Sequence, residues 1–161
     1  MSIMLSLIAA AAAPLPARPV MPQFQVVDAS KCDDPAERKR VFSGEATKGI
    51  STGVAERYNQ EWRTYLEARM AQIGMSKEDR SEFATGVLKS DAFVQLQNAN
   101  TDLFKQMSGD LDSINASKDE VVSCRAIAHM TVILPQVVAN ADRQYALMDA
   151  ALDAIAAKRG K

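Results

Sequence analysis

Apolar residues recur at alternating steps of three and four between Val121 and Ala157. The row that they form contains Ile127, Met130, Leu134, Val137, Ala141, Tyr145, Met148, Leu152 and Ile155. This spacing places them on one face of an α-helix. Ser117 followed by Glu120 indicates a capping box at the start of the helix, and Lys158 and Gly160 suit its end. We predict one long helix here, around which the rest of the chain is organised.

The first half of this predicted helix is apolar on two sides. A second apolar row contains Val121, Cys124, Ala128 and Val132. Only a narrow polar strip, which includes Arg125 and His129, separates the two rows. Because such a helix is normally buried against several neighbours, we place this half in the middle of a bundle. Pro135 lacks the N–H that would bond to the Thr131 carbonyl, so we expect a bend or a break there.

A second helix is predicted over residues 54–73, where aromatic and aliphatic side chains share one face. Tyr58, Trp62 and Tyr65 belong to this face, and Gly74 suits the C-terminal end of the helix. We interpret Trp62 as a core anchor. The outward members of the aromatic set are candidates for contact with a partner protein.

Two further helices are expected between residues 76 and 116. Ser76 with Asp79 caps a short one, and Ser90 opens a longer one. The apolar stripe of the longer helix contains Phe93, Leu96, Leu103, Met107, Leu111 and Ile114. Asn100 interrupts this stripe, so its amide either bonds a neighbouring helix or contacts a ligand. No strand pattern competes, and the prediction is an all-α helical bundle of about four main helices.

The N-terminal region divides into two parts. An apolar stretch with small residues up to Ala13 predicts a signal peptide over residues 1–17, although a frayed apolar end or a misplaced start is an alternative. Residues 18–41 form a proline-rich, largely non-helical N-terminal arm with a short helix that begins at Asp34–Pro35. The bundle domain is expected over residues 42–161. This division predicts a periplasmic or secreted protein with no stable membrane anchor once the signal is removed.

The cysteine pair agrees with export. Cys32 and Cys124 are the two cysteines of the chain. In an oxidising compartment an even pair is more often bridged than free, so we predict a disulfide between them. The alternative is two buried thiols.

Charge and motifs exclude several function classes. The 161 residues carry 19 basic and 20 acidic side chains, a balance without the basic surface that nucleic acid requires. There is a single histidine, and there is neither a Cys-x-x-Cys pair nor a Gly-x-Ser-x-Gly elbow. We therefore predict no catalytic residue, no metal site and no cofactor. Haem bound through His129 is disfavoured because this side chain lies on the polar strip.

By elimination, we expect an exported, non-enzymatic interaction protein, an adaptor or a chaperone-like bundle, with an unidentified protein partner. The candidate binding residues are Tyr58, Trp62, Tyr65, Asn100, Arg125 and His129. One alternative is a carrier of a small apolar ligand or cofactor, with a pocket between helices near Asn100 and Ser123. A second alternative is a carboxylate-dependent hydrolase, which needs acidic side chains converging in a cleft. The sequence does not indicate an oligomeric state.

Overall fold

The computed structural model describes residues 14–45, 47 and 52–160. They form a short 3-10 helix and five α-helices, and no strand occurs among them. The elements are η1 (Ala29–Asp33), α1 (Pro35–Phe42), α2 (Thr52–Ile73), α3 (Lys77–Leu88), α4 (Asp91–Ala116) and α5 (Glu120–Lys158). The predicted all-α fold is confirmed. Most of the predicted signal peptide, residues 1–13, lies outside the described residues.

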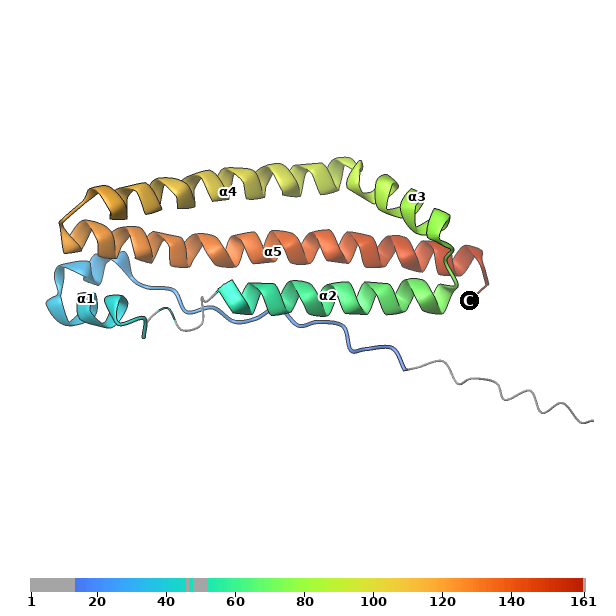
Figure 1. The fold of residues 1–161 in the computed structure, drawn as a ribbon, viewed down its shortest axis with the longest axis horizontal. Coiled ribbons are helices and arrows are strands. Elements are labelled where there is room, and N and C mark those ends of the chain that lie inside the picture. Colours follow the sequence, from blue (N-terminus) through green and yellow to red (C-terminus); the bar gives the residue numbers. More distant parts are fainter. Residues whose placement is uncertain (1–13, 46, 48–51, 161) are drawn as a thin grey trace, which may run out of the picture.

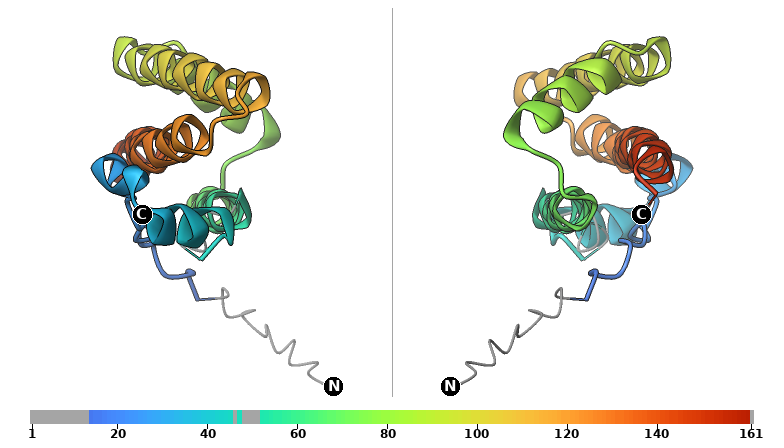
Figure 2. Two further views of the ribbon diagram at one scale, coloured as in Figure 1. Left: turned by 90° about the vertical axis from the view of Figure 1, so that its left-hand side faces the viewer. Right: turned by 90° about the vertical axis from the view of Figure 1, so that its right-hand side faces the viewer.

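Helix α5 lies in the middle of the molecule, with α4 on one side and α2 on the other (Figure 1). A turn of three residues joins α4 to α5, so these two helices run antiparallel. Helix α2 runs parallel to α5. The Tyr58–Asp142 and Tyr65–Asp149 hydrogen bonds show this, because both join residues 84 positions apart. Seen end on, α5 lies between α4 and α2, and α3 crosses from α2 to α4 (Figure 2).

Most of the predicted helix ends are found in the structure. Ser76 and Asp79 exchange both hydrogen bonds of a capping box, and the Ser90 hydroxyl accepts from the Phe93 N–H. Gly74 follows α2 with a φ of 73°, a conformation that glycine adopts without strain. Asp34 caps α1, and Pro35 occupies its first turn.

The predicted start of the central helix is wrong by two residues. Its N-cap is Asp119, whose carboxylate accepts from the Val121 N–H. Ser117 instead ends α4, where its N–H donates to the Ser113 carbonyl and its hydroxyl accepts from the Asp119 N–H. Ser117 is therefore needed in the turn and is not available to cap α5.

Of the bend or break expected at Pro135, the break does not occur, because α5 continues through the proline as one helix of 39 residues. A proline inside a helix costs roughly 3 kcal/mol or more. Ile133, Val137 and Val138 are buried around it, so packing on both sides of α5 offsets this cost.

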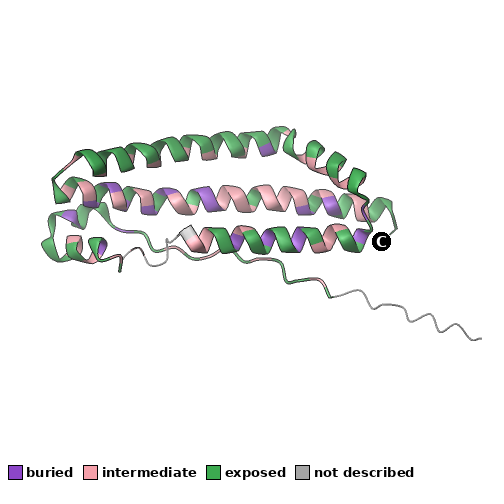
Figure 3. Cartoon of the chain, viewed as in Figure 1, coloured by how far each residue is buried: buried purple, intermediate pink, exposed green. Residues whose placement is uncertain are grey.

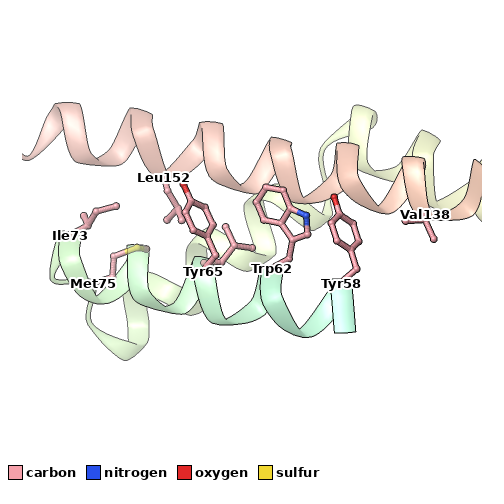
Figure 4. Close-up of a cluster of buried hydrophobic side chains, with 8 residues drawn as sticks. Tyr58, Trp62, Tyr65, Ile73, Met75, Val138 and Leu152 are labelled. Carbon is pink, nitrogen blue, oxygen red and sulfur yellow. The ribbon is translucent and has the colours of Figure 1, made fainter. Parts of the chain in front are cut away.

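The larger core lies between α2 and α5 (Figure 4). Trp62 is fully buried there, and its ring stacks on Tyr145 at a centroid distance of 5.3 Å. Tyr65 meets the edge of the same indole at 5.6 Å. The interpretation of Trp62 as a core anchor is confirmed.

A smaller core surrounds the predicted disulfide, which the structure contains. Cys32 and Cys124 are bridged and fully buried, with their Cα atoms 5.8 Å apart. Val27 and Val41 pack beside the bridge, and the Val27 N–H donates to the Thr131 hydroxyl at 2.9 Å. The first half of α5 thus contacts α4, η1 and α1, as its two apolar rows predict.

Among the described helices, α5 is long and apolar enough to cross a membrane. The core helix of a bundle has the same length and composition, and here α5 lies between α2 and α4. The absence of a membrane anchor stays a prediction.

Candidate functional site

Helix α4 is amphipathic, yet only one of its 26 residues, Phe93, is buried. Figure 3 shows exposed residues along most of its length, in contrast to α5 below it. Phe104 is 53% exposed and Leu111 is 50% exposed. Single exposed apolar residues are ordinary, but Phe104 and Leu111 lie on the same side of α4, and the neighbouring apolar residues Leu103 and Met107 are only half-buried. Helix α4 therefore carries more apolar surface than α5 alone can cover.

A groove of about 540 Å³ runs between α2 and α4, and α5 forms its floor. Its apolar lining consists of Leu66, Met70, Phe93, Phe104, Val137, Ala141 and Met148. Each of the three helices contributes to this lining over about three turns, so a chain segment of roughly 16 Å fits along it. The groove joins the exposed face of α4 to the edge of the main core.

Asn100 lies in this groove, at the crossing of α4 and α5. The Asn140 amide donates to Asn100 Oδ1 at 2.9 Å, and the Asn100 amide lies 3.5 Å from the Val137 carbonyl. The interpretation of Asn100 as a polar residue that bonds a neighbouring helix is confirmed. Its contact with a ligand stays a prediction.

One part of the groove wall is polar. The Tyr145 hydroxyl donates to Asn59 Oδ1 at 3.3 Å, and Arg63 lies beside the same phenol. Burial raises the pKa of Tyr145, while the Arg63 guanidinium lowers it in part. Arg63 has no ion-pair partner among the described residues, although it borders the groove. This cluster provides a cation, a hydroxyl and an amide beside an apolar surface, which can bind an anionic group at the Asn59 end of the groove. Glu67, one turn further along α2, adds a carboxylate to the same wall.

Tyr58, Trp62 and Tyr65 face α5 and not the solvent, and all three are buried. The Tyr58 hydroxyl donates to Asp142, and the Tyr65 hydroxyl donates to Asp149 at 3.3 Å. Burial and the Asp142 carboxylate raise the pKa of Tyr58 to about 12. The expectation that outward members of this set contact a partner does not fit, because the helix face that holds them forms the α2–α5 interface.

Arg125 and His129 lie in the first third of α5, and neither lines the groove. Arg125 pairs with Asp33 at 3.0 Å, and His129 Nδ1 lies 2.8 Å from Asp110 Oδ2. Both pairs join α5 to a neighbouring element, so the two side chains have a structural role. Their part in partner binding stays a prediction. Ser123 does not line the groove, so the pocket predicted near Asn100 and Ser123 is found at Asn100 only.

Three carboxyl groups have lowered pKa values, which do not suit a general acid. Hydrogen bonds from Ser30, Arg40 and Arg159 lower the pKa values of Asp28, Glu37 and Asp79 respectively. A general acid needs a shift in the opposite direction. In the described part of the chain, no three potential metal ligands come together.

No family model matches the chain, and comparisons with curated proteins and with solved structures find no similar protein.

Proposed function

We propose that the protein is an exported, non-enzymatic interaction protein that binds a helix in the groove between α2, α4 and α5. The exposed apolar face of α4 is the observation that carries this proposal. Three long helices line the groove, and a fourth helix laid along it would complete a four-helix bundle. Amphipathic helices commonly bind in apolar grooves of this kind.

Phe104 is the side chain with most to gain from such binding. Its ring stands at the groove wall with about half of its surface in water. Burial of apolar surface contributes roughly 25 cal/mol per Å², and aromatic anchors often account for more than about 2 kcal/mol of binding energy. We therefore expect Phe104 to dominate the contact with a bound helix.

Export agrees with two features of the chain. The apolar stretch before residue 14 resembles a signal peptide, and the Cys32–Cys124 disulfide is a bond that persists in oxidising compartments. Together they favour the periplasm or the cell exterior as the site of action.

Photo-cross-linking in the producing cells tests the proposal. A photoreactive amino acid at position 104 is compared with one at Asn98, an exposed position on the outward side of α4. We expect position 104 to form protein adducts in the exported fraction, while position 98 forms few. Equal labelling from both positions, or no protein adduct from position 104, would overturn the proposal.

A second candidate function uses the same groove for a small apolar ligand with an anionic group. The cluster of Arg63, Tyr145 and Asn59 favours it, and the groove volume falls within the usual range of ligand sites. Native mass spectrometry of protein purified from the exported fraction tests this alternative, because a retained ligand adds a defined mass. An Arg63→Ala variant that retains the same mass in equal amount would contradict the role of the cluster.

A further inference from the structure

The N-terminal arm passes over the edge of the α2–α5 interface. Residues 18–28 run as an extended segment beside α2 (Figure 1). The Arg18 guanidinium stands over the Trp62 ring, 5.3 Å from its centroid, and Arg18 Nε lies 3.9 Å from Asp149 Oδ2. The arm approaches from outside the interface, since the Arg18 side chain is 55% exposed. An arginine of the chain itself therefore occupies a position between an aromatic ring and a carboxylate.

We propose that Trp62 and Asp149 form an arginine site for a proline-rich, extended segment of a partner protein. Residues 18–26 of the arm, here called the strap, occupy this site within the same chain and thereby inhibit binding. The site is separate from the groove, since no residue lines both the groove and the hollow beneath the strap. The inference goes beyond the proposed function, which concerns a helix bound in the groove.

Asp149 makes the site selective for a cation. It is only 8% exposed, and it lies 3.3 Å from the Tyr65 hydroxyl and 3.7 Å from Arg69 Nη1. Its Oδ1 nevertheless accepts no hydrogen bond from a described residue. Buried acceptors normally have a donor, and the face of a tryptophan ring attracts cations. An arginine side chain interacts with both, because its planar guanidinium stacks on aromatic rings and donates to carboxylates.

The strap indicates which kind of segment fits. Pro19 follows Arg18 directly and Pro22 stands three residues further, so the segment is extended and forms no regular helix. Phe24 packs against the main core and provides a second anchor. Proline-rich segments bind aromatic surfaces at a small entropic cost, because their extended conformation is already formed.

The strap is held mainly by side chains. In the part of the chain that the structure describes, the backbone of residues 18–26 makes no hydrogen bond to a helix, and the first such bond joins Val27 to Thr131. Val20 is 84% exposed, and a hollow of about 390 Å³ lies between this part of the arm and α2. Segments with few buried contacts open locally at a low free energy, so the strap can detach up to Val27.

Detachment leaves the rest of the fold in place. The Cys32–Cys124 disulfide lies beyond the strap and keeps the following η1 on α5. Asp149 retains Arg69 when Arg18 leaves, so no buried charge loses its last partner. A partner segment can therefore replace the strap without unfolding the bundle.

The fluorescence of Trp62, the only tryptophan of the chain, reports on the site. The probe is an acetylated peptide with the sequence of residues 18–27, and the control peptide has alanine in place of its arginine. Both are titrated into the Arg18→Ala variant of the exported chain. We expect acrylamide to quench this variant more than the wild type, and the arginine peptide to reverse the difference with saturation. The alanine peptide should bind about tenfold more weakly, and the wild type should need more peptide because its tethered strap competes.

Val20→Ser is the matched control variant, because it changes an exposed position of the strap and should leave the quenching unchanged. Three results overturn the proposal: equal quenching of Arg18→Ala and wild type, no saturable response to the arginine peptide, or equal responses to the two peptides. If Arg18→Ala loses its helical circular dichroism, binding of the two labelled peptides to the wild type is measured by fluorescence anisotropy, and the same tenfold difference is required. Adducts from position 104 report on the groove alone, so this proposal and the proposed function can fail separately.

Discussion

Replacing Cys32 and Cys124 together with alanine removes the covalent link between the N-terminal arm and α5. The two positions are 92 residues apart, so the disulfide closes a loop that includes α1, α2, α3 and α4. The change leaves no free thiol that could mispair. Noncovalent contacts of the N-terminal arm, such as the hydrogen bond from Val27 to Thr131, are retained.

The chain-entropy model gives the size of the effect. For a loop of this length, closure removes about 4.6 kcal/mol of conformational free energy from the unfolded state. Measured losses for native disulfides in small domains lie between about 2 and 5 kcal/mol, because strain and residual structure reduce the gain. We therefore expect the free energy of unfolding to fall by 2 to 5 kcal/mol, on the order of a third of the stability of a typical domain.

Urea denaturation followed by circular dichroism measures this difference. Arg125→Ala is the matched control, because it breaks the exposed Arg125–Asp33 pair between the same two segments. An exposed ion pair contributes about 1 kcal/mol or less, so the control should shift the midpoint only slightly. The oxidised state of the wild type is verified beforehand by mass spectrometry with alkylation.

A loss similar to that of the control would refute the reasoning. It would mean that η1 and α1 detach from α5 before the bundle unfolds, so that closing the loop does not constrain the cooperative unit. Hydrogen exchange separates the two cases, since early detachment exposes amides of α1 while those of α2 stay protected.

Two further predictions concern single side chains. The pKa of Tyr58 rises from 10.0 to about 12 on folding. Its contribution to the free energy of unfolding is therefore complete below pH 10 and is lost as the pH rises from 10 to 12. The urea midpoint should decline over this window, and Tyr58→Phe should decline less; equal slopes contradict the shift. Asp119→Ala should lower the free energy of unfolding by about 1 kcal/mol, as loss of an N-cap does. Ser117→Ala should lower the free energy of unfolding by less than Asp119→Ala does. A larger loss for Ser117→Ala in urea denaturation would indicate that Ser117 caps α5, as first predicted.

Much of the fold could be predicted from the sequence, because the signals that specify it are local. The capping box at Ser76 and the glycine after α2 act within a few residues, and each is found where predicted. The start of α5 was missed because Ser117 and Asp119 are both good capping residues. Which of them caps α5 depends on how tightly the chain turns after α4. The packing of α4 against α5 determines this turn, and a local sequence signal does not show it.

The direction of α2 could not be predicted. Its apolar face predicts burial but does not specify a partner helix, and either orientation on α5 would bury Trp62. The choice becomes visible only through pairs that the structure brings together, such as Tyr58 with Asp142 and Tyr65 with Asp149. Tyr58 and Tyr65 could therefore be interpreted as partner contacts. A tyrosine has an apolar ring and a polar hydroxyl, so it suits an interface between helices of one chain as well as one between chains.

Only the part of the groove at Asn100 was predicted, although the sequence contains a signal for the rest of it. Phe104 lies one residue beyond Leu103, outside the predicted stripe of α4, and it widens the apolar surface past the width that one neighbour covers. A helix inside a complete bundle packs on two or three neighbours, whereas α4 packs mainly on α5. The apolar surface of α4 that α5 does not cover therefore indicates where a single chain leaves a groove open. This uncovered surface lies across the groove from Arg63. The proposed helix partner is therefore expected at the groove and not at the aromatic face of α2.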